Sequence, residues 1–447
     1  MQTVTLEQML EARERRARRQ RELIAQFGLP LVSFTMNIPG PVKNSPLIRR
    51  GFRLGERCLT EHLALSGGNI VHAEATDAAT GCEGLYVVDM DPEALKKLTC
   101  AIEEQGPPGR LFDMDVVAPD GRKLERQTPR PCLICGGPAI ECARSRAHDV
   151  KTLQLAAEAM LSGALYGEDI ETAAGLAVRA LLYEVAVTPK PGLVDRANNG
   201  SHADMDFYTF LSSASGLWPY FADCVRIGIR TAPQSPPETL AALRFPGMQA
   251  ECAMRRATGN VNTHKGAIYS MGLLCGALGR LDRAVWNQPE RVLKEAAAMA
   301  ADSVKRELGS VAHHTAKTAG ERIYAMYGVA GVRSDAERGF PSVLYHGLPV
   351  LEAGLAEGKT PDEAGAAALL AIIAHTADTN VISRVGIEGQ KAASGALRVL
   401  LEKQPYPDRA TLETLDRAYI AQNLSPGGCA DLLAICWMLH FLREANL

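Results

Sequence analysis

The segment LQLAAEAMLSGALYGEDIETAAGLAVRALLYEVAV, residues 153–187, decides how the chain is organised. It is rich in Ala and Leu, and its apolar residues recur with the period of a helix. Strand-like segments alternate with helical ones upstream, whereas every apolar segment downstream has a helical pattern. With 447 residues, the chain also exceeds what one hydrophobic core normally serves. We therefore expect two domains, an α+β domain over residues 1–160 and an all-α domain over residues 165–447, joined without a low-complexity linker.

The composition is that of an ordinary globular protein, with 47% hydrophobic and 22% charged residues. A net charge of −3 provides no global field that would attract nucleic acid or a membrane. The polar start MQTVTLEQML is unlike a signal peptide, and no apolar run reaches membrane-spanning length. Eleven scattered cysteines fit reduced thiols better than a disulfide framework. We expect a cytoplasmic protein that binds neither nucleic acid nor a membrane.

The first domain mixes two kinds of periodicity. Residues 29–36 and 84–90 have the alternation of strands, and residues 5–26 and 92–105 have the pattern of amphipathic helices. This mixture predicts an α+β arrangement.

The loop NIPGPVKNSPLIRR, residues 37–50, follows the first of these strands. Its Pro-Gly-Pro sequence forces a loop, and Lys43, Arg49 and Arg50 make that loop cationic. We interpret the loop as an element that binds substrate phosphates; three solvated surface cations are the alternative. Further arginines that we assign to substrate binding are Arg110, Arg144 and Arg146.

Two aspartates lie two residues apart in the strand-like run RLFDMDVVAP, residues 110–119. Since side chains alternate across a strand, Asp113 and Asp115 are predicted to point to the same side. Paired carboxylates at this spacing suit a divalent metal that holds a pyrophosphate leaving group, so we predict a catalytic Mg²⁺ site here. Two exposed positions on an edge strand are the alternative.

A cysteine-rich segment, RPCLICGGPAIECARSRAHDV, occupies residues 130–150. Cys132, Cys135, Cys142 and His148 are ligand types that structural zinc prefers. Their spacing matches no zinc motif that we can defend, and an intracellular cysteine is commonly a small buried apolar residue. The sequence leaves both interpretations open.

The loop VTPKPGLVDRANNGSHADMDF, residues 187–207, interrupts the helical half. Its prolines and glycines exclude a continuous helix. Lys190 is a candidate phosphate ligand because glycines let the backbone approach closely, and Asp195 is a candidate catalytic carboxylate. Asp204 and Asp206 alternate with a histidine as HxDxD and are candidate Mg²⁺ ligands. Capping of the helix that follows is the alternative for these two aspartates.

Similar polar islands recur downstream at NTHKG, HHTAKTAGE, HTADTN and SPGGCADLL. They supply His264 as a candidate catalytic residue and Lys265 and Lys317 as candidate phosphate ligands. If the HxDxD aspartates only cap a helix, Asp378 and Asp431 are the next candidates for the metal site.

The stretches TPKPGLVDRANNGSHADMDFYTF and GNVNTHKGAIYSMG resemble triphosphoribosyl-dephospho-CoA synthase, and the resemblance covers roughly residues 168–447. It implies that this half joins the ribose of ATP to a ribose hydroxyl of dephospho-CoA and expels adenine. Such a reaction needs cations or Mg²⁺ on the triphosphate and a base for the hydroxyl. It also needs a proton donor for adenine, and a carboxylate near the sugar carbon would stabilise positive charge there.

The stretches NIPGPVKNSPLIRR, GRLFDMDV and PCLIC…CARSRAH resemble apo-citrate lyase phosphoribosyl-dephospho-CoA transferase over roughly residues 4–160. The resemblance implies a nucleotidyltransferase-like fold. It also implies transfer of the phosphoribosyl-dephospho-CoA group to a serine of the citrate lyase acyl carrier (gamma) subunit, with release of diphosphate. Related transferases use a DxD pair, which Asp113 and Asp115 match.

Together these observations predict a bifunctional transferase that makes the citrate lyase prosthetic-group precursor and attaches it. A metal-dependent nucleotide hydrolase with an N-terminal regulatory domain is the first alternative, and a non-catalytic assembly factor for citrate lyase is the second. Adenine release that strictly requires dephospho-CoA distinguishes the first function from both.

Overall fold

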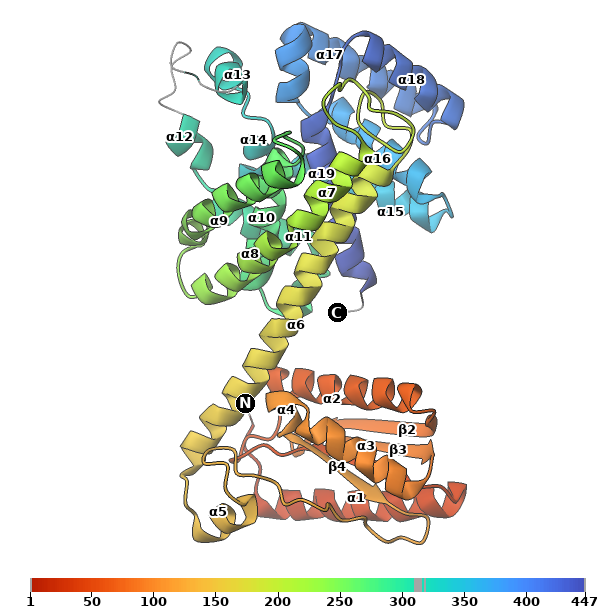
Figure 1. The fold of residues 1–447 in the computed structure, drawn as a ribbon, viewed down its shortest axis with the longest axis vertical. Coiled ribbons are helices and arrows are strands. Elements are labelled where there is room, and N and C mark those ends of the chain that lie inside the picture. The colour runs from red at the N-terminus through yellow and green to blue at the C-terminus, as the bar shows by residue number, and fades with distance from the viewer. Residues whose placement is uncertain (1, 309–315, 317–318, 446–447) are drawn as a thin grey trace. The chain divides into compact units, whose positions relative to one another are not determined.

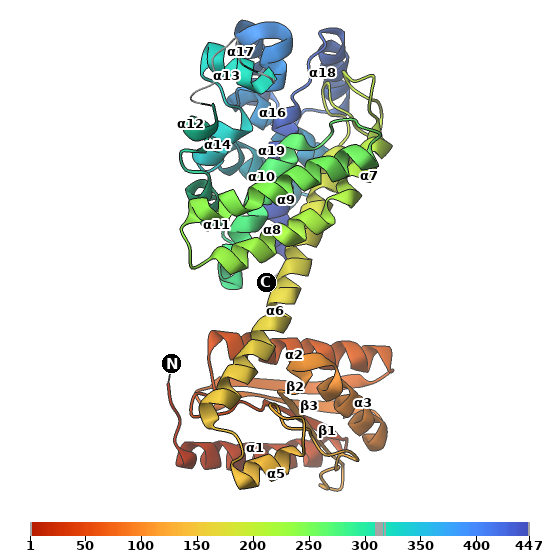
Figure 2. The same ribbon diagram turned by 60° about the vertical axis from the view of Figure 1, so that its left-hand side comes forward.

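The computed structural model describes residues 2–308, 316 and 319–445. The chain divides into two compact units, which we call unit 1 (Met1–Glu168) and unit 2 (Asp169–Leu447). The division falls inside the long helix α6 (Val150–Ala186). The views in Figures 1 and 2 show strands in unit 1 and helices throughout unit 2. The expectation of an α+β unit followed by a helical one is therefore confirmed.

Unit 1 is built on a four-stranded antiparallel sheet with the order β2-β3-β1-β4. The strands are β1 (Leu31–Met36), β2 (Asn69–Ala78), β3 (Gly81–Asp89) and β4 (Phe112–Val117). The helices are α1 (Leu6–Phe27), α2 (Pro46–Leu65), α3 (Pro92–Glu104), α4 (Gly106–Gly109) and α5 (Ala139–Ser145).

Side chains alternate along each strand, so each strand presents residues to both faces of the sheet. Helices pack against both faces. On one face Phe34 of β1 stacks on Phe52 of α2 with ring centroids 4.6 Å apart, and Phe112 meets Phe34 edge-on. On the other face Leu31 packs with Leu23 of α1. The edge strand β4 turns its apolar residues to the first face, so its two aspartates lie on the opposite one.

Unit 2 is helical, and no strand occurs among its described residues. Its helices are α7 (Phe207–Gly216), α8 (Trp218–Thr231), α9 (Pro236–Ala257), α10 (Lys265–Arg280), α11 (Pro289–Ala300), α12 (Ser303–Leu308), α13 (Ala319–Tyr327), α14 (Val332–Glu337), α15 (Leu348–Ala356), α16 (Pro361–His375), α17 (Thr379–Lys403), α18 (Arg409–Ala421) and α19 (Gly427–Glu444). Two short turns, Arg283–Val285 and Val343–Gly347, complete it.

Helices α10, α16 and α19 form the centre of unit 2 and are buried along most of their length. Glycine permits the closest of these approaches. A Cβ on Gly279 of α10 would lie 2.2 Å from the Val225 carbonyl oxygen of α8, and one on Gly228 of α8 would lie 2.2 Å from the Gly276 carbonyl oxygen. Such packing fixes α10 rigidly and therefore fixes its N-terminal end, which carries the NTHKG residues.

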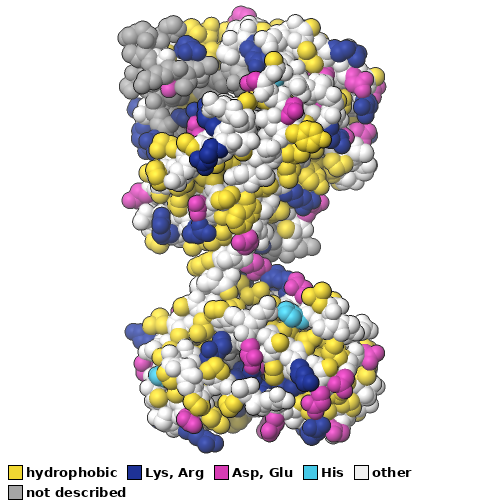
Figure 3. Space-filling model, viewed as in Figure 1, with side chains coloured by type: hydrophobic (Ala, Val, Ile, Leu, Met, Phe, Trp, Pro, Cys, Tyr) yellow, Lys and Arg dark blue, Asp and Glu magenta, His cyan; other side chains and the backbone are white. Residues whose placement is uncertain are grey.

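Acidic and basic side chains are interspersed on the face that Figure 3 shows. Among the described helices, none alone is long and apolar enough to cross a membrane, although the bent pair α16 and α17 meets the length and composition criteria together.

Candidate functional site

The loop between α6 and α7 folds around Asp195. This buried carboxylate accepts hydrogen bonds from the backbone N–H groups of Lys190 (2.9 Å), Ala197 (2.7 Å) and Asn198 (3.0 Å). Both carboxylate oxygens are therefore engaged by the loop's own backbone. This geometry supports a positioning function for Asp195, and its catalytic function stays a prediction.

The same loop is fastened to the C-terminal part of unit 2. Asp416 of α18 accepts hydrogen bonds from the Gly192 N–H (2.9 Å) and the Asn198 side chain (2.8 Å). Gly192 has a φ of +72°, and a Cβ there would lie 2.2 Å from the Leu424 carbonyl oxygen. Ser201 also donates to that carbonyl over 2.6 Å. Only glycine allows the loop to approach so closely.

Lys190, a predicted phosphate ligand, is almost completely buried and forms an ion pair with Glu184 of α6. Burial raises the pKa of Glu184, and the charge of Lys190 opposes that rise. Ion pairs this deep are costly to desolvate, so they often mark a site where charge has a function. Sequence reasoning missed Glu184 because it lies within an apolar helix.

His264 precedes α10 and is buried beside this ion pair. Its Nδ1 shares a hydrogen bond of 2.7 Å with Ser213 Oγ, whereas its Nε2 is buried without a partner. Burial, and secondly the positive charge of Lys190, lower the His264 pKa to about 3. The imidazole is therefore neutral at pH 7. A buried ring nitrogen without a protein partner can accept a hydrogen bond from a ligand or from water.

Three carboxylates, Glu184, Asp378 and Asp431, form what we call the acid cluster. Burial is the largest cause that raises the pKa of each one, and for Asp431 the charges of Glu184 and Asp378 add to it. Asp378 accepts backbone N–H groups from Asn380 (2.7 Å) and Cys429 (3.0 Å). Asp431 retains some exposure to solvent.

Helix ends surround the acid cluster. Asp378 caps the N-terminus of α17 and contacts that of α19, and Asp431 accepts a hydrogen bond from the Ala267 N–H at the start of α10. A Cβ on Gly266 would lie 1.9 Å from Asp431 Oδ2, so glycine is required for that contact. Helix N-termini carry partial positive charge, which favours carboxylates and phosphates.

Asp204, Asp206 and Lys265 lie on the surface of unit 2. Asp206 caps α7 by accepting the Thr209 N–H (2.8 Å), and Asp204 is 65% exposed, 3.9 Å from His202 Nδ1. Lys265 pairs with Glu251 at 3.2 Å. Lys317 lies outside the described residues. The structure thus brings Lys190 and His264 together and gives Asp204, Asp206 and Lys265 other partners.

Unit 2 also contains an apolar cavity of about 770 Å³ between α17 and α18. Its lining includes Ala392, Ala396, Leu397 and Leu415. Tyr419 also lines it, with a buried hydroxyl that has no partner. Thr411, Thr414 and Gln422 line it as well, so the cavity offers a long, mostly apolar ligand several polar contacts.

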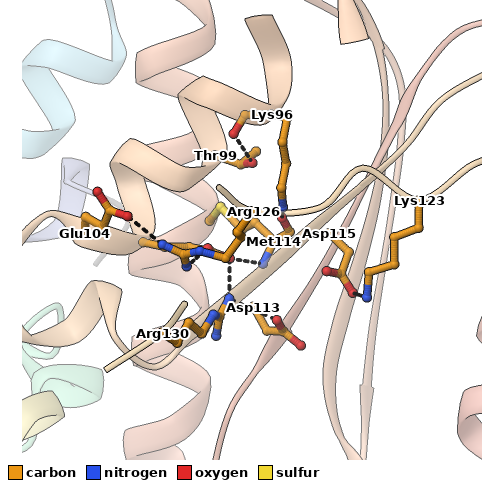
Figure 4. Close-up of polar contacts among 10 residues, drawn as sticks. Lys96, Thr99, Glu104, Asp113, Met114, Asp115, Lys123, Arg126 and Arg130 are labelled. Atoms are coloured by element: carbon orange, nitrogen blue, oxygen red, sulfur yellow. Dashed lines mark hydrogen bonds and ion pairs between the residues drawn. The ribbon is translucent and has the colours of Figure 1, made fainter. Parts of the chain in front are cut away.

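In unit 1, Asp113 and Asp115 point to the same side of β4, as predicted, and each has a cationic partner (Figure 4). Asp113 is 3.0 Å from Arg130, and Asp115 is 2.5 Å from Lys123. Both carboxylates remain partly exposed, so a divalent ion can reach them. Adjacent same-side residues of a strand lie about 7 Å apart, close enough for both side chains to reach one ion.

Glu103 of α3 holds two arginines beside this aspartate pair. The carboxylate is 2% exposed, contacts Arg126 (2.6 Å) and Arg130 (2.5 Å), and accepts the Met114 N–H (2.6 Å) (Figure 4). Burial raises the Glu103 pKa, and Arg130 is the largest opposing influence. Local sequence patterns do not reveal this group, because Glu103 in α3 is more than twenty residues away from Arg126 and Arg130.

A cavity of about 750 Å³ in unit 1 is lined by four arginines: Arg110, Arg126, Arg130 and Arg146. Arginine binds phosphates in a bidentate manner, so the cavity has the chemistry of a polyphosphate site. The remaining predicted cations are outside its lining. Lys43 donates to the Ile38 carbonyl (2.5 Å), and burial lowers its pKa. Arg49 lies 3.8 Å from Asp77, Arg144 is exposed, and Arg50 follows Arg49 on α2.

Comparison with known proteins divides the chain at nearly the same place. The family model CitX, apo-citrate lyase phosphoribosyl-dephospho-CoA transferase, matches residues 4–163. The family model CitG, ATP:dephospho-CoA triphosphoribosyl transferase, matches residues 170–447.

Individual relatives show the same arrangement. Protein CitXG of Haemophilus influenzae is 35% identical over 97% of this chain and 95% of the relative. Protein CitXG of Leuconostoc mesenteroides subsp. cremoris is 32% identical over 97% and 96%, respectively. The 2-(5''-triphosphoribosyl)-3'-dephosphocoenzyme-A synthase of Pectobacterium atrosepticum is 43% identical over 58% of this chain and 86% of that protein.

Proposed function

The chain belongs to the family of CitXG proteins, and from this premise we propose how its two units share the chemistry. It is a bifunctional transferase in the biosynthesis of the citrate lyase prosthetic group. It makes 2'-(5''-triphosphoribosyl)-3'-dephospho-CoA from ATP and dephospho-CoA with release of adenine. It then transfers the phosphoribosyl-dephospho-CoA group to a serine of the apo-citrate lyase acyl carrier subunit with release of diphosphate.

We assign the synthase reaction to unit 2, and the observation that carries this assignment is the buried acid cluster beside His264. The bond between the ribose C1'' of ATP and adenine breaks, and C1'' bonds to the hydroxyl oxygen of dephospho-CoA. The acid cluster takes the proton of that hydroxyl and gives a proton to the ring nitrogen of the departing adenine, because burial raises the pKa values of its carboxyl groups. The same carboxylates stabilise positive charge on the sugar carbon. His264, held neutral, offers Nε2 for a hydrogen bond that orients the substrate.

The acid cluster also fits Mg²⁺ better than the HxDxD aspartates do. Lys190 pairs with Glu184, and the charges of Glu184 and Asp378 raise the pKa of Asp431, so a cation beside Asp431 would relieve this repulsion. Asp378 already binds backbone N–H groups through both oxygens, which leaves Glu184 and Asp431 as the residues that would hold the ion. Mg²⁺ often takes only one or two carboxylates and completes its shell with water and phosphate oxygens. When bound, it neutralises the triphosphate of ATP.

We assign the transferase reaction to unit 1 as a nucleotidyltransferase-like domain. The arginine-lined cavity would receive the triphosphate, and Asp113 and Asp115 beside it would hold Mg²⁺. Breaking their pairs with Arg130 and Lys123 would free those cations for the departing diphosphate. The acyl carrier subunit supplies the serine hydroxyl, which attacks the phosphorus atom attached to the ribose and displaces diphosphate.

The wild-type protein tests the proposed function directly. We expect adenine release from ATP only when dephospho-CoA is present, and labelling of the apo acyl carrier subunit only when both substrates are present. ATP turnover without dephospho-CoA would favour a nucleotide hydrolase instead. Residues 165–447 alone should still release adenine, because the ATP:dephospho-CoA triphosphoribosyl transferase family model matches residues 170–447.

We propose that the cavity between α17 and α18 receives the pantetheine arm of dephospho-CoA. The arm is long and largely apolar with amide groups, which matches the Ala and Leu lining and the unpartnered Tyr419 hydroxyl. Ala396 is exposed and lines the cavity, so Ala396→Trp should fold and fill it. We expect a KM for dephospho-CoA raised about tenfold, with the KM for ATP unchanged; one wrong or missing apolar contact is worth about 1–3 kcal/mol. Val399→Trp, exposed on the same helix outside the cavity lining, is the control. Equal effects of both variants would exclude the cavity as the site.

A further inference from the structure

The cysteine-rich segment of unit 1 gathers four metal-ligand atoms. The sulfur atoms of Cys132, Cys135 and Cys142 and a ring nitrogen of His148 all lie within 4.8 Å of one another. Within the described part of the chain, no other set of three or more His, Cys, Asp or Glu residues meets this criterion. The spacing that matched no zinc motif in the sequence therefore folds into a compact donor set.

The turn from Cys132 to Cys135 is shaped to present two sulfurs. The Ile134 N–H donates to Cys132 Sγ over 3.5 Å, and the Gly136 N–H donates to the Cys132 carbonyl over 3.2 Å. Gly136 has a φ of +74°, which glycine adopts readily.

The sulfur positions fit a metal and not a disulfide. Cys135 Sγ and Cys142 Sγ are 3.5 Å apart, whereas bonded sulfurs lie about 2.05 Å apart. Two thiolates at about 2.3 Å from a tetrahedral zinc ion lie about 3.8 Å from each other. The observed separation is close to that edge of the tetrahedron.

Two further observations indicate that the side chains of this segment do not stabilise it by themselves. His148 Nε2 is buried and has no hydrogen-bond partner. Helix α5, between Cys135 and His148, contributes no buried residue, so apolar packing contributes little to its stability (Figure 1). Polypeptide without a core of its own commonly depends on a metal or disulfide.

We propose that Cys132, Cys135, Cys142 and His148 bind one structural Zn²⁺ ion. Three thiolates and one imidazole are soft and borderline donors, which select zinc over Mg²⁺ or Ca²⁺. Four protein ligands close the coordination shell, so the ion is structural. It fixes the segment that presents Arg130 and Arg146 to the cavity of unit 1. The site is thus distinct from the Mg²⁺ site expected at Asp113.

Metal analysis of the full-length protein, purified without chelator, tests the proposal. We expect about one zinc ion per chain by mass spectrometry, and Cys135→Ser and His148→Asn should each reduce that content. Cys252→Ser, which changes an exposed cysteine of α9, is the matched control and should retain the ion. Zinc content unaffected by Cys135→Ser would overturn the assignment.

Cobalt substitution tests the site in the wild-type protein, so the result does not depend on whether a variant folds. Wild-type protein stripped of metal and given Co²⁺ should show the intense visible bands of tetrahedral cobalt and sulfur-to-cobalt charge transfer. Their absence, or a Cys135–Cys142 disulfide in protein kept under reducing conditions, would overturn the proposal. Stripping should also impair attachment to the acyl carrier while adenine release continues.

Discussion

Units 1 and 2 differ in how the acidic side chains of their candidate sites are paired with cations. In unit 1, Asp113 and Asp115 each have a cationic partner, and Glu103 is matched by two arginines. In unit 2, Lys190 pairs with Glu184, whereas Asp378 and Asp431 accept hydrogen bonds from backbone N–H groups. The difference teaches why we propose different ligands for the two units: a polyanion for the arginines of unit 1, and a cation or protons, together with the substrate, for the carboxylates of unit 2.

The largest effect should come from separating the two reactions. Asp431→Asn is expected to lower adenine release by about 10²–10⁴-fold, the range for a positioned acid or base, because it removes the member of the acid cluster that retains some exposure to solvent. Asp113→Asn should block attachment of the chemically prepared intermediate and spare adenine release. Separate assays of the two half-reactions measure this. Asp204→Asn is the control for Asp431→Asn, and loss of both activities in either variant would contradict the division of labour.

The contrast in charge balance predicts the next effect. Lys190→Met leaves Glu184 buried without a cation and should destabilise unit 2 by about 3–5 kcal/mol. The exposed pair of Lys265 with Glu251 should contribute at most about 1 kcal/mol, so Lys265→Met is the control. Urea unfolding measures both. If Glu184→Gln in the Lys190→Met background restores no stability, the unpaired charge is not the cause.

Acidification should change the stability of unit 2 through the buried His264. The His264 pKa is about 3 in the folded protein and about 6.5 when unfolded, so the unfolded state binds the extra proton between these values. The contribution of His264 to stability is therefore complete above pH 6.5 and falls as pH drops toward 3, by up to about 1.4 kcal/mol per pH unit.

The raised pKa values of Glu184, Asp378 and Asp431 act in the opposite direction, since those groups bind protons more readily in the folded state. The measurement is therefore the difference between wild type and His264→Gln in urea unfolding at pH 7, 6 and 5. We expect the variant to lose less stability on acidification. Parallel pH curves would show that His264 is not held neutral.

The smallest effect concerns the HxDxD residues. Asp206→Ala should cost about 1 kcal/mol of stability through loss of the α7 cap, with turnover per folded molecule unchanged. Thermal unfolding and steady-state kinetics over a Mg²⁺ series measure the two quantities. A depressed turnover with altered Mg²⁺ dependence would restore Asp206 as a metal ligand.

The sequence was most informative where function follows a local period. The alternation of β4 placed Asp113 and Asp115 on one side of the sheet, because a strand has a fixed period of two. The Ala- and Leu-rich composition that begins at residue 153 marked the change from the mixed unit to the helical one. Lys190 and His264 were identified because polar residues in Gly-rich loops stand out from their surroundings.

The remaining site residues depend on contacts between distant parts of the chain. Glu184 reads as one polar position in an apolar helix, and only the folded loop places Lys190 against it. Glu103 becomes part of a site only when Arg126 and Arg130 fold back onto α3. Local periodicity carries no information about such pairings, so composition and spacing could not supply them.

The close contact at Gly266 has a consequence for reading other genomes. Because any side chain there would collide with the Asp431 carboxylate, a gene copy that encodes another residue at this position could not keep the acid cluster as it stands. Under the proposed function of the acid cluster, one codon would therefore be a simple marker for separating working synthases from decayed duplicates that retain the helical fold. Sequencing surveys could apply that marker before any protein is made.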